Sequence, residues 1–433
     1  MVCTKGIFTG EKNMKWNIFK QYSGLTKSAY VLFFARLVTS MGSFIWPMLT
    51  LIMSLKLGYS EIEIAKIFLL IAVVFLPGAI IGGKLADKFN KKKIIIIFDL
   101  ITVTFFILCS LVEPGNLMLI FFCIAGLFAT MEGPAHEALA IEASLPKDRD
   151  KLFSLTYLGF NIGFIIGAAL GGFMITSHLS LAFIIDGTTT LMSTILIIMF
   201  VVPIKQEEIK EEDKNKYEEE THHDSGIHIL RNRKSILYQI LLVTITAFIY
   251  DQWSFVIPLH MADLFGDING PLFYGFVASF NGFVVIIATP LLTYFFRKIF
   301  EIPKIITALV LYGISFALLI NANELPIFFI FIFLFTIGEI LNSISFSPFL
   351  SRRIPATHRG RINSYIGIFA FTGMILGKLL IGTLAEKFGF NIAYLSLVVF
   401  SGLGAILTYF NYFLDKKLFP DLYKKIETIV KPE

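Results

Sequence analysis

Charged side chains interrupt several long apolar stretches of this sequence, and they are the residues best suited to chemistry. They are Arg36, Lys66, Asp99, Glu132, His136, Glu137, Glu142, Asp186, Asp251, Glu339 and Lys378. An ionised group at the centre of a lipid bilayer costs about 3 kcal/mol or more, so we expect each to face a partner or a water-filled cavity. In membranes, such residues relay protons and bind ions or small molecules.

Two carboxylic acids are expected near the middle of their apolar stretches. Neither Asp251 nor Glu339 has an obvious basic neighbour at that depth, and the candidate partner, Lys378, is expected to lie too far toward one end. A buried carboxyl group without a basic partner can exchange protons near physiological pH. We therefore predict that Glu339 carries a proton, with a structural ion pair as the alternative.

Four other charged residues are expected nearer to the ends of their stretches. Arg36, Asp99 and Glu137 lie at similar depths, roughly 10 Å inside at about 1.5 Å per helical residue. A structural bridge between Arg36 and either Glu137 or Asp99 is therefore predicted. Glu142 is expected at the mouth of the stretch that contains Glu137.

The composition places these residues in an all-α polytopic membrane protein. The 433 residues are 56% hydrophobic and 16% charged, against about 25% charged in soluble domains, so a soluble enzyme and a disordered chain are both excluded. Since a bilayer core of about 30 Å needs roughly 20 apolar residues per helix, twelve spans can be drawn. They are 30–54, 62–84, 92–113, 117–141, 152–175, 180–203, 236–262, 271–296, 303–321, 325–350, 362–385 and 390–414. Continuous runs of this length exclude a membrane β-barrel.

Basic residues mark one side of the membrane. If the N-terminus is cytoplasmic, the cytoplasmic segments contain most of the 37 Lys and Arg residues, whereas only Lys56 and Lys387 fall in outside loops. The positive-inside rule therefore predicts that both termini are cytoplasmic. No short apolar core with a cleavage site precedes the first span, so we expect no cleaved signal peptide.

A long polar stretch divides the twelve spans into six plus six. We expect a cytoplasmic segment 1–29, a six-helix bundle 30–203, a linker 204–235, a second six-helix bundle 236–414 and a cytoplasmic tail 415–433. His222, His223 and His228 lie near acidic residues of the linker, but a solvated charged loop explains them better than a metal site does. Because CxxC, HExxH and GxSxG motifs are absent, we predict no metal centre, cofactor or enzyme activity.

The loop after the second span carries a recognisable pattern. It reads Gly83-Lys84-Leu85-Ala86-Asp87-Lys88-Phe89-Asn90-Lys91-Lys92-Lys93. It resembles the signature loop of the major facilitator superfamily, with Asn90, which tolerates a left-handed backbone, in place of the usual Gly. The resemblance implies two six-helix bundles and a conformational switch made by Gly83, Asp87, Lys91 and Lys92. Gly83 is expected to allow a close helix contact. Asp87 is expected to accept hydrogen bonds from the start of span 11 in the outward-facing state.

The fifth span contains small residues at four-residue spacing, which permits tight helix crossing. Gly163, Gly167, Gly171 and Gly172 resemble the antiporter motif of drug exporters in that superfamily, with Ala168 where the motif has Pro. Generic small-residue packing is the alternative interpretation.

Acidic residues in three spans resemble those of the proton-coupled multidrug antiporters in the same superfamily. Glu142 and Glu339 match acidic positions in spans 4 and 10, whereas Ser254 stands at the acidic position of span 7, about one turn from Asp251. The resemblance implies that these acids serve protons and cationic drugs. The candidate proton-coupling and substrate-binding residues are therefore Glu339, Asp251, Glu142, Glu137 and Arg36.

Aromatic side chains of the second half are candidates to border a cavity, because aromatic faces suit lipophilic cations. They are Trp253, Phe255, Phe346, Tyr365, Phe369 and Phe371. In a chain with 46 Phe residues, packing against the core or against lipid is the alternative for any one of them.

These patterns predict a secondary active transporter of the bacterial cell membrane that exports lipophilic or cationic drugs in exchange for protons, by alternating access. The expected partners are a small-molecule substrate, protons and the bilayer, with no nucleic acid, and the chain is expected to act as a monomer. A proton-coupled uptake permease and a narrow-specificity exporter are the alternatives. A peptide permease is disfavoured because Leu32 and Ala35 replace acidic residues of the E-x-x-E-R signature that ends at Arg36.

Overall fold

The structure, a computed structural model, describes residues 22–145, 148–204, 233–297, 299–354 and 356–423, with the backbone alone for most of the first turns after 356. Every regular element in these ranges is a helix. They are α1 (Lys27–Gly42), α2 (Leu49–Leu51), the π-helix η2 (Ile52–Lys56), α3 (Glu61–Lys88), α4 (Lys91–Leu111), α5 (Asn116–Glu142), α6 (Arg149–Ser177), α7 (Leu179–Phe200), α10 (Lys234–Tyr250), the 3-10 helix η5 (Asp251–Ser254), α11 (Val256–Phe295), α12 (Glu301–Leu318), α13 (Leu325–Arg353), α14 (Ala356–Phe388) and α15 (Phe390–Leu418).

These helices make twelve membrane crossings. One long helical segment contains two of the crossings, and another crossing is made of two helical pieces. Ten described segments are long and apolar enough to cross a membrane, and one of them, Lys234–Phe295, has 62 residues. That segment reverses at Gly266, whose φ of 80° is readily adopted by glycine. The reversal is tight, since a Cβ on Gly270 would lie 2.5 Å from the Cα of Ala262. The remaining crossing is α1, which breaks after Gly42 and continues through η2. The all-α polytopic fold is thus confirmed.

Helix starts follow from local side-chain chemistry. Ser60 and Glu63 form a reciprocal capping box that begins α3. Asn90 begins α4, because its side chain accepts a hydrogen bond of 3.2 Å from the backbone N–H of Lys93. The backbone of Asn90 has φ −64°, so the left-handed conformation that Asn tolerates is not used at this position.

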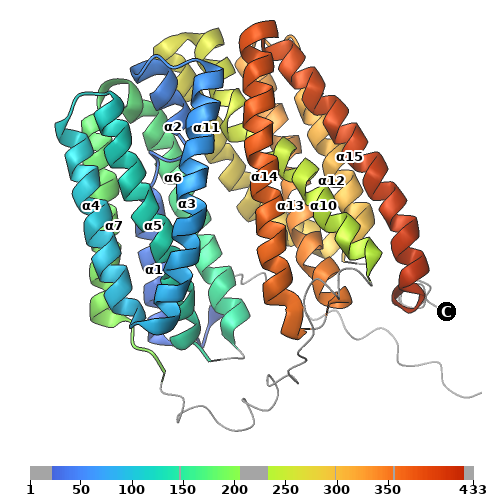
Figure 1. Ribbon diagram of the computed structural model, residues 1–433, viewed down its shortest axis with the longest axis horizontal. Coiled ribbons are helices and arrows are strands. Elements are labelled where there is room, and N and C mark those ends of the chain that lie inside the picture. The colour runs from blue at the N-terminus through green and yellow to red at the C-terminus, as the bar shows by residue number, and fades with distance from the viewer. Residues whose placement is uncertain (1–21, 146–147, 205–232, 298, 355, 424–433) are drawn as a thin grey trace, which may run out of the picture.

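The helices form two groups that Figure 1 shows side by side. Helices α1 and α3 to α7 pack on one another, and α10 to α15 do the same. Helices α3, α10 and α13 place Lys88, Lys234 and Arg353 at one end of the molecule, which we call the basic end. The opposite end is called the far end. In Figure 1 the two groups lie close together at the far end and diverge toward the basic end.

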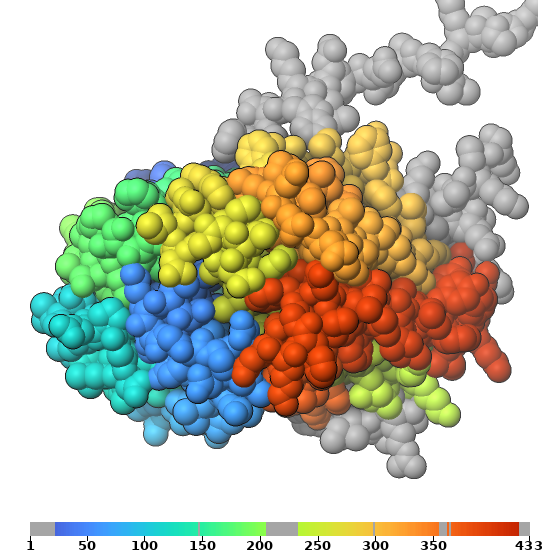
Figure 2. Space-filling view, turned by 90° about the horizontal axis from the view of Figure 1, so that it is seen from above, coloured from blue at the N-terminus to red at the C-terminus, as the bar shows by residue number. Residues whose placement is uncertain are grey.

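Contact between the two groups is made by α6 with α11 and by α3 with α14. Figure 2, seen from above, shows the two halves of the chain in contact. Across the first pair, the hydroxyl of Ser279 donates to the carbonyl of Ile165 at 2.7 Å. Across the second, the backbone N–H of Ile62 donates to Glu386 at 3.0 Å. Ile62 and Glu386 lie at the far end, so this end is held closed.

Glycines of α6 allow close contact with two different helices, α1 and α11. Gly163, Gly167 and Gly171 lie against α1, where an added Cβ would come within 3 Å of atoms from Leu37 to Phe44. Gly172 lies against α11 of the other group, and its Cβ would meet the carbonyl oxygen of Pro271 at 2.4 Å. The antiporter-like motif is therefore a packing surface in which the last glycine lies at the contact between the two halves.

The close helix contact that was expected at Gly83 is made by the preceding residue, Gly82. A Cβ on Gly82 would lie 2.1 Å from the carbonyl oxygen of Met131 in α5, whereas a Cβ on Gly83 would meet nothing within 4 Å. The expectation that Gly83 permits a close helix contact is wrong, because the α3 face that meets α5 runs through the preceding residue.

Replacing Gly172 by Leu should open the far end. The added side chain clashes with the backbone of α11, and such overpacking costs about 1–3 kcal/mol. We expect Gly172→Leu to increase labelling of Thr50→Cys by an impermeant thiol reagent, since Thr50 is buried between the halves. Gly402→Leu is the control, because a Cβ at Gly402 meets nothing within 4 Å. Equal labelling in the two variants would contradict this account of the crossing.

Candidate functional site

The seventh span is interrupted halfway along. The α-helix α10 ends at Tyr250, η5 covers Asp251–Ser254, and α11 begins at Val256. Pro258 has no N–H to donate to the carbonyl of Ser254, four residues earlier. That carbonyl instead accepts a hydrogen bond of 3.3 Å from the hydroxyl of Thr50, which belongs to the other half of the chain. Interrupted helices are a usual place for substrate and ion sites in transport proteins.

Glu339 on α13 is held by neutral donors. The hydroxyl of Tyr250 donates to it at 2.9 Å, and the side-chain amide of Asn281 donates at 3.0 Å. Asn281 is itself fixed by Thr336, one turn before Glu339, at 2.7 Å. In the described part of the chain, no basic group lies within ion-pair distance of Glu339, which agrees with the sequence. Tyr157, of the first half, is within electrostatic range of this half-buried carboxyl group, so Glu339 lies near the contact between the halves.

Asp251 forms an ion pair with Lys378 of α14, although neither was expected to reach the other. The two side chains are about nine-tenths buried, with exposed fractions of 9% and 10%. The expectation that Asp251 lacks a basic neighbour is therefore wrong. The depth estimate assumed a straight helix, whereas η5 changes the path of the chain just where Asp251 leaves α10.

A pocket of about 300 Å³ lies beside this ion pair. It lies between the halves, since its lining comes from both: Trp46, Pro47, Thr50, Phe68, Ile71, Ala72, Phe75 and Phe164 on one side, and Asp251, Trp253, Ser254, Phe371, Met374, Ile375 and Lys378 on the other. Apolar and aromatic groups make most of the wall. Such a lining with a few polar groups suits a small lipophilic molecule.

Two of the aromatic residues singled out in the sequence border this pocket, namely Trp253 and Phe371. Phe255 is fully buried in the core. Phe346, Tyr365 and Phe369 pack against a separate apolar cluster around Phe349. Core packing, the alternative interpretation, therefore holds for these four side chains.

A second group of polar side chains lies inside the first half. Thr194 donates to Asp99, and a carboxylate oxygen of Glu132 lies against Nε2 of His136. The ligand atoms of Asp99, Glu132 and His136 all lie within 4.8 Å of one another, an arrangement that could hold a cation. The guanidinium of Arg36 is within electrostatic range of Glu132 and opposes a bound metal ion.

Arg36 does not form the structural bridge expected of it. Its guanidinium lies 4.9 Å from the centre of the Phe160 ring, and no carboxylate of the described residues is within ion-pair distance. Glu137 is exposed and interacts with Arg36 only at longer range. Asp99 is bonded to Thr194 instead, because α4 packs against both α5 and α7.

The loop after α3 lies open at the basic end. Asp87 is exposed, and the side chains of residues 356–361, where its expected partner lies, are outside the described residues. Lys91 forms an ion pair of 2.9 Å with Glu142, and Lys92 donates to the carbonyl of Ile198 at 3.3 Å. The two lysines therefore join α4 to α5 and α7.

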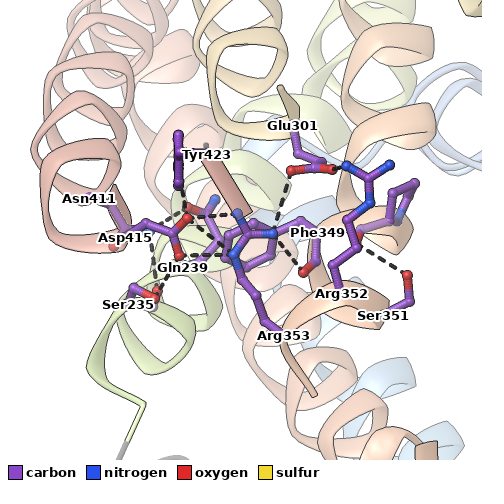
Figure 3. A network of polar contacts seen from close by, with 11 residues as sticks. Ser235, Gln239, Glu301, Phe349, Ser351, Arg352, Arg353, Asn411, Asp415 and Tyr423 are labelled. Carbon is purple, nitrogen blue, oxygen red and sulfur yellow. Dashed lines mark hydrogen bonds and ion pairs between the residues drawn. The ribbon is translucent and has the colours of Figure 1, made fainter. Parts of the chain in front are cut away.

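The most extensive polar network was missed by the sequence analysis. Arg353 donates to Asp415 at 2.6 Å and pairs with Glu301 at 3.4 Å, and all three side chains are buried (Figure 3). Asp415 also accepts from Ser235 at 2.8 Å and from Tyr423 at 2.7 Å. The network joins α10, α12, α13 and α15. Its basic members were interpreted only as cytoplasmic charge, because separations of more than 50 residues give no local signal.

Comparison with known proteins places this architecture in a family. A family model described as Major Facilitator Superfamily matches residues 32–306 and 302–427. The chain belongs to the major facilitator superfamily. It is therefore a multi-pass transporter of the cell membrane rather than an enzyme.

Relatives of this transporter differ in what their names state. The uncharacterized MFS-type transporter YttB of Bacillus subtilis (strain 168) is 23% identical over 82% of this chain and 88% of its own length. A Na(+), Li(+), K(+)/H(+) antiporter of Planococcus maritimus is 23% identical over 82% of this chain and 89% of its own. The multidrug resistance protein MdtH of Yersinia pestis (strain Pestoides F) is 26% identical over 34% of this chain and 37% of its own.

Solved structures share the fold of this transporter. A peptide transporter has a TM-score of 0.71 at 15% identity, covering 90% of this chain and 94% of its own. The nucleoside transporter NupG has a TM-score of 0.72 at 14% identity, covering 89% of this chain and 100% of its own. At such identities the likeness shows the fold alone.

Removing Arg353 should destabilise this transporter far more than removing its neighbour. Arg353→Met leaves Asp415 buried without its cation, which costs about 3–5 kcal/mol. Arg352 also pairs with Glu301, at 2.7 Å, but its side chain is half exposed, so Arg352→Met should cost about 1 kcal/mol or less. Thermal unfolding of the purified variants measures the difference. Equal unfolding midpoints would show that the network is not a stabilising element.

Proposed function

We propose that this transporter exports lipophilic small molecules in exchange for protons, and that Glu339 carries the proton. The observation that supports this is the setting of Glu339: a half-buried carboxyl group held by Tyr250 and Asn281, without a basic partner in the described residues. Both donors are neutral, so the group can gain or lose a proton without breaking an ion pair. It also lies near the contact between the halves, beside which a substrate would pass.

The mechanism is alternating access with the basic end in the cytoplasm. In the described conformation the far end is closed by the α6–α11 and α3–α14 contacts. Export requires these contacts to separate while the basic ends approach each other. Protonation of Glu339 changes the charge in the space between the halves and so biases the two states. Asp87 would make its helix-end contact in the opposite state, because it is exposed in this one.

The substrate class follows from the pocket between the halves. Its aromatic wall and its volume of about 300 Å³ favour a planar lipophilic compound. The resemblance to multidrug antiporters adds cationic drugs to that class. Glu142 is engaged by Lys91 at the mouth, so its contribution is secondary to that of Glu339. We expect one chain to suffice, because both halves of the pocket come from the same polypeptide.

A second candidate function is exchange of a monovalent metal cation for protons. It is a narrow-specificity form of export, and it is favoured by the buried oxygen atoms of Asp99, Glu132 and Thr194. A relative named as a Na(+), Li(+), K(+)/H(+) antiporter supports it. In vesicles with an imposed pH gradient, this function predicts that added Na+, Li+ or K+ dissipates the gradient and that Asp99→Asn abolishes the effect. No change in the gradient would exclude it.

The drug-export proposal predicts a specific loss in Glu339→Gln. Inside-out vesicles energised by a pH gradient should accumulate a bis-benzimide dye, and an uncoupler should collapse the accumulation. Glu339→Gln keeps the size and shape of the side chain but cannot exchange a proton, so we expect accumulation to fall by about tenfold or more. Glu113→Gln, an exposed acid near the far end, is the matched control and should transport normally.

Three results would contradict parts of the proposal. Equal accumulation by Glu339→Gln and the control would mean that another group carries the proton. Accumulation only in right-side-out vesicles would indicate the uptake permease. Dye movement that survives the uncoupler would remove proton coupling altogether.

A further inference from the structure

The pocket between the halves already contains a cation of its own. A carboxylate beside aromatic rings is the usual protein site for an organic cation. Here the ammonium of Lys378 pairs with Asp251 and lies 4.8 Å from the centre of the Phe68 ring and 5.7 Å from that of Phe255. Lys378 thus takes the place that a cationic ligand would have at such a site.

The position of Lys378 is fixed by the packing of its helix. Gly377, the preceding residue, lies so close to α10 that an added Cβ would come within 2.8 Å of the carbonyl oxygen of Phe248 and 2.5 Å of the Gln252 side chain. This contact holds α14 against the end of α10, from which Asp251 emerges. The ion pair is therefore set by the backbone, and the side chains are about nine-tenths buried.

The charges of the pocket are balanced within it. Among the described residues that line it, Asp251 is the one carboxylate and Lys378 the one basic group. An organic cation would meet an ammonium and a carboxylate that is already neutralised. An anion would have to displace Asp251 from Lys378. An uncharged ligand needs neither rearrangement and gains the contacts of the aromatic wall.

We propose that this pocket binds uncharged aromatic compounds and that Lys378 excludes organic cations from it. The inference rests on the proposed function and narrows its substrate class. Lys378 is thus a residue that determines specificity: without its ammonium, Asp251 and the ring of Phe68 would form a site for a lipophilic cation.

The test compares two ligands with the same ring skeleton and different charge. Dihydroethidium is uncharged and ethidium is a permanent cation, and quenching of the pocket tryptophans Trp46 and Trp253 reports binding to the purified full chain. We expect the unaltered protein to bind dihydroethidium about tenfold or more tightly than ethidium. In Lys378→Met, we expect ethidium binding to tighten by about tenfold or more while dihydroethidium binding changes by less than about threefold.

The double variant Asp251→Asn with Lys378→Met is the matched control. It removes both charges, so it leaves no buried charge unpaired. Without the carboxylate of Asp251, the ethidium affinity gained in Lys378→Met should be lost, so ethidium should bind about as weakly as it binds the unaltered protein, while dihydroethidium binding should change by less than about threefold. Equal binding of the two ligands by the unaltered protein overturns the proposal. So does a Lys378→Met variant whose preference is unchanged, or a double variant that keeps the gained ethidium affinity. Because binding is measured without a pH gradient, failure of proton coupling at Glu339 leaves this test intact.

Discussion

The interruption of the seventh span at Asp251–Ser254 is the constraint around which the second half of the protein is arranged. The side chains of successive helix residues point about 100° apart, so Tyr250 and Asp251 contact different helices. Tyr250 donates to Glu339 on α13, and Asp251 pairs with Lys378 on α14. A change in the protonation of Glu339 and a change in the pocket charge therefore act on adjacent residues of one short turn. If the seventh span were one continuous helix, no irregular turn would link the proton site at Glu339 to the ion pair in the pocket.

The two halves differ in how firmly their parts are held. Within the second half, Arg353 binds Asp415 and Glu301 in a buried network that joins four helices, so this bundle can move as a rigid body. Between the halves, the contacts are close helix crossings at small residues, such as Gly172 of α6 against α11, and a few hydrogen bonds. Rigid bundles with a thin contact between them suit a rocking motion, because separating the halves exposes little buried charge.

Several features followed from the sequence because their causes are local. The spans are set by apolar length, and the structure places their ends within a few residues of the predicted ones. The sequence foresaw that Glu339 has no basic partner among the described residues, because no basic residue was expected at its depth. Asp251 was misjudged because its depth was calculated along a straight helix. Gly83 was misjudged because a loop pattern does not say which of two adjacent glycines faces the next helix.

The amino-acid sequence by itself determined that this chain crosses the membrane twelve times, since hydrophobic length and the positions of breaking residues act over a few turns. It also determined which ionisable groups lie within the membrane-spanning stretches and therefore need a partner or a water-filled cavity. The tertiary structure alone decided which of these groups meet. The ion pair of Asp251 with Lys378 and the network around Arg353 join residues more than 50 positions apart. Such pairings depend on how helices rotate and pack, and no local pattern encodes that rotation.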